Sequence, residues 1–169
     1  MKKPKIIIIV GAPGVGKTTV AKILAKRLNG VYMKLSHLRA FHLDPKWKNA
    51  SRKEANMAYE NLVFIAKNYV RHNYTPVIIE DILTTHSQRL KKDFLGLPIF
   101  IVNLVMSNQD TQKKRVLTES RDSGYRNWKD ALVINRFYQR RKISSVEMKT
   151  DTTTISANSA VNKIISALK

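Results

Sequence analysis

The sequence contains no cysteine, and that absence excludes two kinds of structure. A chain without thiols forms no disulfide framework, and it offers no thiolate ligands to a metal ion. Its 169 residues must instead fold around an ordinary hydrophobic core, for which a hydrophobic content of 43% suffices. A cysteine-free chain is compatible with the cytoplasm, and we expect the protein to be cytoplasmic.

Long apolar runs, repeats and low-complexity linkers are missing as well. The apolar run at residues 6–10 follows MKKPK, but it is too short for a membrane span or for a signal peptide. It leads into a glycine-rich segment instead of a small-residue cleavage site. We therefore expect no membrane association, and a single domain over residues 1–169 that is a monomer or a small oligomer.

Acidic residues are scarce: Asp and Glu number 12 against 31 Lys and Arg, which gives a formal net charge of +19. A positive field raises the local concentration of phosphate-bearing ligands. A polynucleotide would gain most, because each neutralised phosphate releases counterions. The basic residues are nevertheless spread along the chain without a long block, which is also typical of a solvated basic surface. Nucleic-acid binding and a merely basic surface both stay open.

What the sequence does have is the segment GAPGVGKT at residues 11–18, which fits the pattern G-x-x-x-x-G-K-[ST] in full. It follows four isoleucines and a valine, a run typical of a strand buried on both faces, and a helical pattern begins directly behind it. Strand, glycine-rich loop and helix in this order predict a phosphate-binding loop. The glycines let backbone N–H groups line a concavity that attracts anions, and the helix N-terminus adds its dipole.

Two side chains of this segment complete the expected site. Lys17 supplies a point charge for the outer phosphates, and Thr18 supplies a hydroxyl for Mg²⁺. We expect these residues to contact a bound nucleotide: Gly11, Ala12, Gly14, Val15, Gly16, Lys17, Thr18 and Thr19.

Strand patterns alternate with helix patterns along the rest of the chain, which predicts an α/β fold with a parallel sheet. The further strands are expected at residues 31–35, 75–81, 98–105 and 146–149. Helices are expected at residues 18–28, 36–41, from Ser51 with Glu54 as its capping-box partner, 84–94, 108–120, 128–142 and 156–168. Gly30 suits the left-handed residue that ends the first helix.

Two acids, Glu80 and Asp81, close the apolar strand at residues 75–81. Ligands of parallel sheets bind beyond the carboxyl ends of the strands, which is where the loop also lies. A carboxylate there holds Mg²⁺ through water, opposite the Thr18 hydroxyl. Glu80 is the first choice because it continues the apolar run, and a helix cap is the alternative for Asp81.

Three arginines, Arg115, Arg121 and Arg126, flank a glycine-containing loop. Phosphoryl transfer spreads negative charge over oxygens that guanidinium groups stabilise well. We expect a lid at about residues 119–128 that brings these arginines over the phosphates and excludes water. A basic surface hairpin between two helices is the alternative.

These features resemble the small P-loop kinases, which include adenylate-, shikimate- and gluconate-kinase-like enzymes, antibiotic phosphotransferases and polynucleotide-kinase-like AAA-type proteins. The matching pieces, which span nearly the whole chain, are GAPGVGKTT, LSHLR, PVIIED, Arg89, RVLTESRDSGYR and TDTT. The resemblance implies a P-loop NTPase three-layer fold, with a five-stranded parallel sheet of order 2-3-1-4-5 and a helical lid. It also implies ATP and Mg²⁺ as cofactors, and it puts Thr152 and Thr153 near the adenine.

One position departs from that pattern. Many of these kinases carry an Asp after the second strand, three residues before an Arg, and this Asp takes the proton of the acceptor hydroxyl. Here Ser36 stands in its place and Arg39 is retained, and both are expected to bind the acceptor. Because serine is a poor base at neutral pH, an alcohol acceptor would need another base, for which Glu80, Asp81, His37 and Asp44 are candidates.

The leading hypothesis is a Mg-ATP-dependent kinase that transfers the γ-phosphoryl group to a small molecule or a nucleotide. The net charge of +19 motivates an alternative, a polynucleotide 5′-hydroxyl kinase. The uncertain base motivates another, a non-catalytic ATP-binding regulatory module. The absence of an Asp at position 36 favours a nucleotide acceptor, or the non-catalytic module, over an alcohol acceptor.

Overall fold

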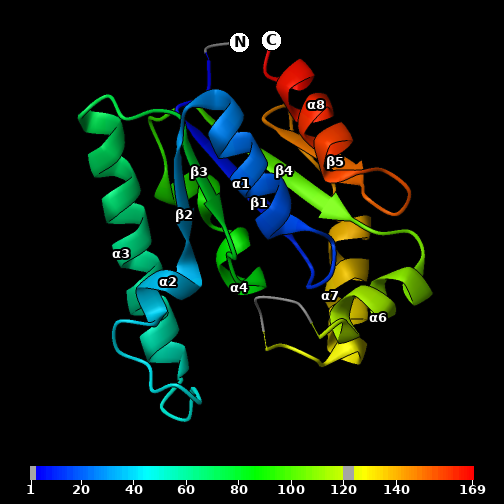
Figure 1. The fold of residues 1–169 in the computed structure, drawn as a ribbon. Helices are drawn as coiled ribbons and strands as arrows, with labels where there is room; N and C mark the ends of the chain where they lie inside the picture. Colours follow the sequence, from blue (N-terminus) through cyan, green and yellow to red (C-terminus); the bar gives the residue numbers. More distant parts are fainter. Residues whose placement is uncertain (1–2, 120–123) are drawn as a thin grey trace.

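A five-stranded sheet forms the centre of the computed structural model, which describes residues 3–119 and 124–169. Every strand pair runs parallel, in the order β2-β3-β1-β4-β5 (Figure 1). The strands are β1 (Ile6–Gly11), β2 (Val31–Lys34), β3 (Val77–Glu80), β4 (Ile99–Val105) and β5 (Glu147–Asp151). The predicted α/β class and strand order are confirmed.

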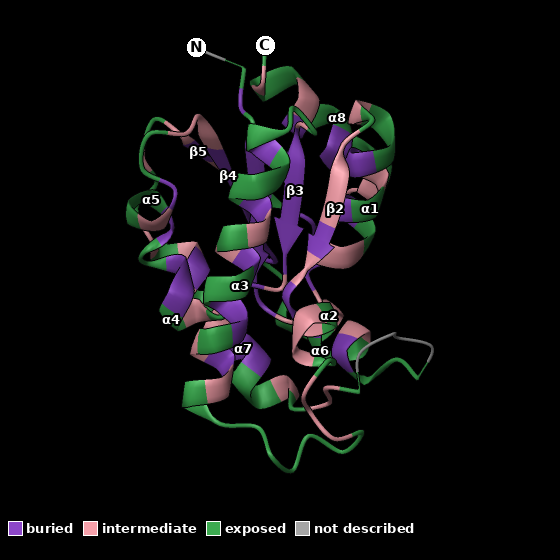
Figure 2. Cartoon of the chain, turned by 90° about the vertical axis from the view of Figure 1, so that its left-hand side faces the viewer, coloured by how far each residue is buried: buried purple, intermediate pink, exposed green. Residues whose placement is uncertain are grey.

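Helices cover both faces of the sheet and complete three layers. They are α1 (Lys17–Leu28), α2 (Leu35–Arg39), α3 (Arg52–Arg71), α4 (Thr84–Ser87), α5 (Leu90–Asp93), α6 (Gln109–Leu117), α7 (Trp128–Arg140) and α8 (Ala157–Ala167). Apolar residues of α3, α5 and α7 form one core layer, and those of α1 and α8 form the other. Figure 2 shows the buried residues gathered on the strands and on the inward faces of the helices.

The isoleucine run of β1 lies at the middle of this arrangement. Ile6 and Ile8 pack into the layer that contains α3, whereas Ile7 and Ile9 pack into the layer that contains α1. All four are 0% exposed, because β3 and β4 pair with β1 on either side and helices cover both faces. This burial fixes the direction in which β1 ends and therefore the position of the loop that follows it.

The single helix expected at residues 84–94 is wrong, because the structure forms two short helices there, α4 and α5. The Ser87 hydroxyl donates a hydrogen bond to the carbonyl of Thr84, a local contact that competes with helix propagation. His86, Ser87, Leu90 and Phe94 are all buried on the two short helices and the turn between and after them. The break positions His86 against α3.

The expectation that Gly30 takes the left-handed conformation is also wrong. Asn29 has φ 49° and forms the left-handed cap of α1, a conformation that asparagine tolerates. Gly30 is needed for a different reason: a Cβ there would lie 2.5 Å from the Pro76 carbonyl oxygen and 2.5 Å from Ile78 Cδ1. The chain must pass this close to β3 for β2 to enter the sheet beside it.

No helix within residues 3–119 and 124–169 combines the length and the apolar character that a membrane crossing requires.

Gly30→Ala should destabilise the fold by about 1–3 kcal/mol, because the added methyl group has no room beside the backbone of β3. Urea unfolding measured by circular dichroism gives this difference. Gly124→Ala is the matched control, since a Cβ at Gly124 meets no atom within 4 Å. Equal stability of the Gly30→Ala variant and the wild type would show that β2 can shift to make room.

Candidate functional site

The glycine-rich loop lies between the end of β1 and the start of α1, as its sequence predicts. Gly11 has φ 146°, and a Cβ there would lie 2.3 Å from the Leu104 carbonyl oxygen, so only glycine fits. Gly16 is the N-cap of α1 and has no side chain to bond the first N–H groups of the helix. Those N–H groups remain available for an anion. Lys17 Nζ reaches back to the Ala12 carbonyl oxygen at 3.1 Å.

Two side chains brace this loop from behind. The Thr152 hydroxyl, which is buried, donates to the carbonyl oxygens of Val15 at 2.9 Å and Val105 at 3.2 Å. Gln112 Nε2 donates to the Pro13 carbonyl oxygen at 3.0 Å and to the Ala131 carbonyl oxygen at 3.1 Å. The loop is thus tied to β5 and α6 before any ligand binds. The sequence carries no sign of the Gln112 contact, because nothing in the pattern separates it from a surface residue of α6.

The Glu80 carboxylate is the centre of the site's polar contacts. It ends β3, its side chain is 1% exposed, and its Oε1 accepts hydrogen bonds from the Thr18 hydroxyl at 3.0 Å and the Tyr32 hydroxyl at 2.8 Å. Lys34 Nζ lies 3.8 Å from the same oxygen. The structure therefore joins Thr18 and Glu80, as the sequence predicts, and it adds Tyr32 and Lys34, which sequence reasoning missed.

This set of donors fits a magnesium ion. Because the Thr18 hydroxyl donates its proton to Glu80, its lone pairs are free to face a cation. Glu80 Oε2 makes no hydrogen bond to any described residue, so it can accept from metal-bound water. No group of three or more His, Cys, Asp or Glu gathers into a metal cage within residues 3–119 and 124–169. Mg²⁺ keeps several waters and takes one or two carboxylates plus substrate phosphates, and the Thr18 hydroxyl beside the Glu80 carboxylate is a donor set of that kind.

Asp81 lies beside Glu80 but is placed differently. Its backbone has φ 69°, in the left-handed region, and its side chain forms no hydrogen bond or ion pair with another described residue. It does not cap the next helix, since the N-cap of α4 is Leu83. The structure thus brings Glu80, and not Asp81, to Thr18.

The two threonines expected near the adenine lie where β5 ends, together with Arg115. The Thr153 hydroxyl accepts a hydrogen bond from the Ser107 N–H at 2.9 Å. Arg115 contacts the Thr153 carbonyl oxygen at 3.4 Å and Met106 Sδ at 3.8 Å. The structure therefore places Arg115 with Thr153, beside the loop that follows β4.

The predicted lid is only partly described. Arg121 lies outside the described residues. Arg126 donates to the carbonyl oxygens of Tyr125 at 3.1 Å and Glu119 at 3.4 Å. The lid function of residues 119–128 stays a prediction.

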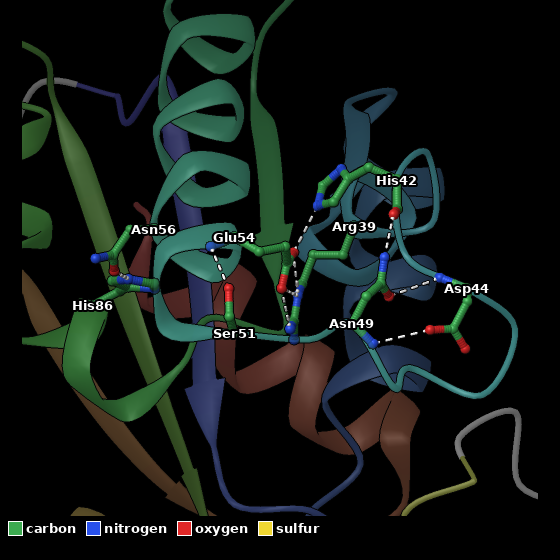
Figure 3. Close-up of polar contacts among 8 residues, drawn as sticks. All are labelled: Arg39, His42, Asp44, Asn49, Ser51, Glu54, Asn56 and His86. Atoms are coloured by element: carbon green, nitrogen blue, oxygen red, sulfur yellow. Dashed lines mark hydrogen bonds and ion pairs between the residues drawn. The ribbon is translucent and has the colours of Figure 1, made fainter.

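On the other side of Glu80, a cluster of polar side chains joins α2 to α3 (Figure 3). Arg39 Nε lies 2.9 Å and 3.2 Å from the two Glu54 oxygens, and Arg39 Nη2 lies 2.6 Å from Oε2. His42 Nε2 lies 2.8 Å from Glu54 Oε1, and the Arg39 guanidinium lies 4.5 Å from the centre of the Trp47 ring. The Arg39 hydrogen bonds, followed by that of His42, lower the pKa of Glu54 to about 2.

The predicted capping box of α3 is therefore only half formed. The Ser51 hydroxyl accepts from the Glu54 N–H at 3.1 Å, as expected, but the Glu54 side chain turns to Arg39. This exchange fixes Arg39 at the mouth of a cavity of about 360 Å³. Among the residues that line it are Arg39, Ser51, Arg52, Asn56, Thr85 and His86, and none of its lining residues is acidic. Ser36 is half-buried on α2 and does not line the cavity.

The residues predicted as candidates for a general base differ in exposure and in hydrogen bonding. Asp44 accepts backbone N–H groups of Lys46 at 2.8 Å and Asn49 at 2.9 Å, and the Asn49 bond is the main reason why its pKa is lowered. His37 is exposed and meets the Tyr32 ring edge-on, with the two ring centres 6.2 Å apart.

His86 was not among the candidates for a base. Its ring stacks on the Tyr59 ring with the centres 4.2 Å apart, its Nε2 lies at hydrogen-bond distance from Asn56 Oδ1, 2.8 Å, and burial lowers its pKa.

Comparison with known proteins gives a consistent result. The model of a family described as the AAA domain matches residues 7–137. A search of curated proteins finds no match.

Solved structures of three kinases cover nearly the whole chain. A gluconokinase from Sinorhizobium meliloti 1021 is 12% identical, with a TM-score of 0.68 over 99% of this chain and 93% of its own. An APS kinase from Mycobacterium tuberculosis in complex with AMPPNP and APS is 17% identical, with a TM-score of 0.63 over 98% of each chain. A shikimate kinase from Acinetobacter baumannii in complex with shikimate is 19% identical, with a TM-score of 0.57 over 97% of this chain and 92% of its own. These likenesses show the fold of a P-loop kinase.

Glu54→Gln should cost about 2 kcal/mol of unfolding free energy at pH 7, because it removes charged hydrogen bonds to Arg39 and His42. The folded-state pKa of about 2 lies below the ordinary value of 4.5, so the carboxylate stabilises the fold above pH 4.5. That contribution declines as the pH falls from 4.5 towards 2. Urea unfolding at pH 7, 4 and 3 should therefore show a gap between wild type and variant that narrows as the pH falls.

Glu60→Gln is the control, because Glu60 is exposed on the same helix and takes part in no hydrogen bond or ion pair within the described part of the chain. Its gap from wild type should be small at every pH. A Glu54→Gln gap that stays constant with pH would contradict the assigned ion pair.

Proposed function

The chain belongs to the AAA domain family, and from that premise we propose that it is a Mg-ATP-dependent kinase that transfers the γ-phosphoryl group to a small molecule or a nucleotide. The observation that carries the proposal is the bond between the Thr18 hydroxyl and Glu80 Oε1, at 3.0 Å. It connects the phosphate-binding loop to a buried carboxylate in the arrangement that a nucleotide-bound Mg²⁺ requires. A loop that bound phosphate for structural reasons alone would have no use for that carboxylate.

Different residues of the loop would bind different parts of the phosphate donor, ATP. The N–H groups of the loop and of the first turn of α1 donate hydrogen bonds to the phosphates of ATP, and Lys17 places its charge beside the outer ones. Thr18 and, through water, Glu80 would hold Mg²⁺, which would supply positive charge beside the phosphates of ATP. Thr152 and Gln112 keep the loop in this shape, so little reorganisation is needed when ATP binds.

Arginines complete the proposed donor side. Arg121 and Arg126 belong to the expected lid, from which they stabilise the equatorial oxygens of the transferred phosphoryl group. A closed lid also excludes bulk water, which would otherwise compete with the acceptor. Arg115, held against Thr153, would define the wall of the adenine pocket.

The cavity beside α3 is the proposed acceptor pocket. It lies at the same end of the sheet as Glu80, because α2 follows β2 and the segment that contains His86 follows β3. Its volume of about 360 Å³ is at the small end of the range for ligand pockets, which favours a small molecule. The three structural neighbours are named as kinases of gluconate, APS and shikimate, which are also small molecules.

Lys17→Met should reduce phosphoryl transfer by roughly 10²–10³-fold. The substitution removes the positive charge of the lysine, which would stabilise the negative charge of the phosphoryl group in the transition state. The measurement is ADP release with a panel of metabolites and nucleoside monophosphates as acceptors, each with Mg-ATP. Lys67→Met, which changes an exposed lysine of α3, is the matched control and should keep full activity. Normal turnover by the Lys17→Met protein on its identified acceptor would refute the assignment.

Glu80→Gln should raise the Mg²⁺ concentration for half-maximal activity roughly tenfold. Glutamine can still bond Thr18 and Tyr32, so the fold is preserved while the negative charge is lost. Initial rates measured over a Mg²⁺ titration at saturating ATP test this. An unchanged Mg²⁺ dependence would place the metal away from Glu80.

A further inference from the structure

Lys34 is a cation at this site that the proposed donor chemistry does not use. It is the last residue of β2, and the parallel register pairs it with Glu80, so that both side chains leave the sheet at the same end. Its side chain is only 13% exposed. Its single ion pair within the described part of the chain is the contact with Glu80 Oε1, at 3.8 Å.

That contact leaves the ammonium group without a true hydrogen-bond partner. Charge-assisted N–H···O bonds are about 2.7–2.9 Å long, well below the distance found here. Glu80 Oε1 already accepts from Thr18 and Tyr32, and Lys34 donates no hydrogen bond to any residue within 3–119 or 124–169. An ammonium group carries three donors, and leaving them unbonded where water is scarce is costly. The group is therefore placed to meet the oxygens of an anionic ligand.

Its position places that ligand on the acceptor side. The sheet order β2-β3-β1 puts Glu80 between the end of β2 and the phosphate-binding loop, with Lys34 on one side and Thr18 on the other. The helix that follows Lys34 directly carries Arg39, which lines the cavity together with Arg52. Lys34 itself does not line the cavity, but it contacts Glu80 and directly precedes the helix that carries Arg39. The lining of the cavity contains two arginines and no acid.

The acids and histidines around the cavity favour an acceptor that needs no deprotonation. Glu54 is bound to Arg39, Glu80 is bound to Thr18 and Tyr32, and Asp44 is bound within its own loop. His86 Nδ1 is buried without a partner, out of reach of a ligand in this conformation. Asp81 forms no hydrogen bond or ion pair with another described residue, and it does not line the cavity, whose charged lining residues are Arg39 and Arg52. Cations of this kind suit an anionic acceptor better than an alcohol.

We propose that Lys34 binds the phosphate of the acceptor, and that the acceptor is a phosphomonoester; this inference rests on the kinase function proposed above. An oxygen of the acceptor phosphate attacks the γ-phosphorus of ATP and forms a new P–O bond. The bond between the γ-phosphorus and the β,γ-bridging oxygen breaks, and ADP leaves with the electron pair. The attacking oxygen of a phosphomonoester dianion carries no proton, so the step needs cations and no general base. The products are ADP and a phosphoanhydride.

The test compares phosphomonoesters with the alcohols from which they derive. The panel contains AMP, CMP, GMP, UMP, ribose 5-phosphate and glycerol 3-phosphate, together with the matching nucleosides, ribose and glycerol. Binding is measured by calorimetry on the protein saturated with Mg²⁺ and a non-hydrolysable ATP analogue, and turnover is measured as ADP release with Mg-ATP. At least one phosphomonoester should bind roughly tenfold more tightly than its alcohol and be turned over.

Lys34→Met should then raise the KM for that phosphomonoester by roughly 10–100-fold, while the KM for ATP changes less than about twofold. Lys34→Arg keeps the charge and should recover part of the loss. Lys67→Met, on the exposed side of α3, should leave both KM values unchanged. A structural role for Lys34 would instead lower stability and affect both substrates equally.

Three outcomes would overturn the inference: turnover of an alcohol without its phosphate, no preference for any phosphomonoester over its alcohol, or an unchanged phosphomonoester KM in Lys34→Met. A separate measurement of ATP binding to the wild type and to Lys17→Met distinguishes failure of the acceptor assignment from failure of the kinase proposal. If ATP binds in a Lys17-dependent way, only the acceptor assignment has failed. If ATP does not bind, the kinase function itself has failed.

Discussion

The Glu80 carboxylate, 1% exposed at the end of β3, is the group on which the rest of the site depends. A carboxylate this deeply buried must be hydrogen-bonded, and its partners come from two elements: Thr18 from α1, and Tyr32 and, at longer range, Lys34 from β2. The register of the central strands brings them together, because Ile9 pairs with Glu80 on one side and Lys34 pairs with it on the other. The same strand pairing that buries the isoleucines of β1 thus also positions the polar groups beyond it. Packing and chemistry are determined by one set of backbone hydrogen bonds.

The position of the glycine-rich loop and of the acid that ends β3 could be predicted from the sequence because both are local features. Residues 6–18 contain the strand, the glycines and the two side chains in one continuous stretch, and β3 ends in the expected acid. The parallel α/β class followed from the alternation of patterns, and the resemblance to P-loop kinases supplied the strand order that the structure confirms. Tyr32, Lys34 and Gln112 could not be found in this way. Each reaches the site through a partner distant in sequence, and a tyrosine in a strand or a glutamine in a helix has no pattern that reveals its partner.

The cavity beside α3 could not be predicted from the sequence, for a related reason. Its walls come from α2, the start of α3 and the short helix α4, and the break after Ser87 depends on the Ser87–Thr84 hydrogen bond and on burial of His86 against α3. Ser51 and Glu54 do mark the start of α3, but the sequence pattern does not reveal that Glu54 binds Arg39 instead of completing the capping box. Arg39 is held on two sides, by Glu54 and by the Trp47 ring, so contacts within the protein fix this wall of the cavity.

The excess of basic residues is partly explained by where the few acidic residues lie. Several of the few acids are used inside the fold, where Glu54, Glu80, Asp93 and Glu147 each form an ion pair with a lysine or arginine. Asp93 and Glu147 lie outside the site, with Asp93 receiving the Tyr59 hydroxyl at 2.7 Å and Glu147 contacting both Lys91 and Arg141 at 2.9 Å. Each of these acids neutralises a basic residue inside the fold, so the excess of basic charge lies on the residues outside these pairs and gives a positive outward field. Such a field concentrates anions in general, whereas Lys34 is the cation that lies beside the central carboxylate itself, 3.8 Å from its Oε1.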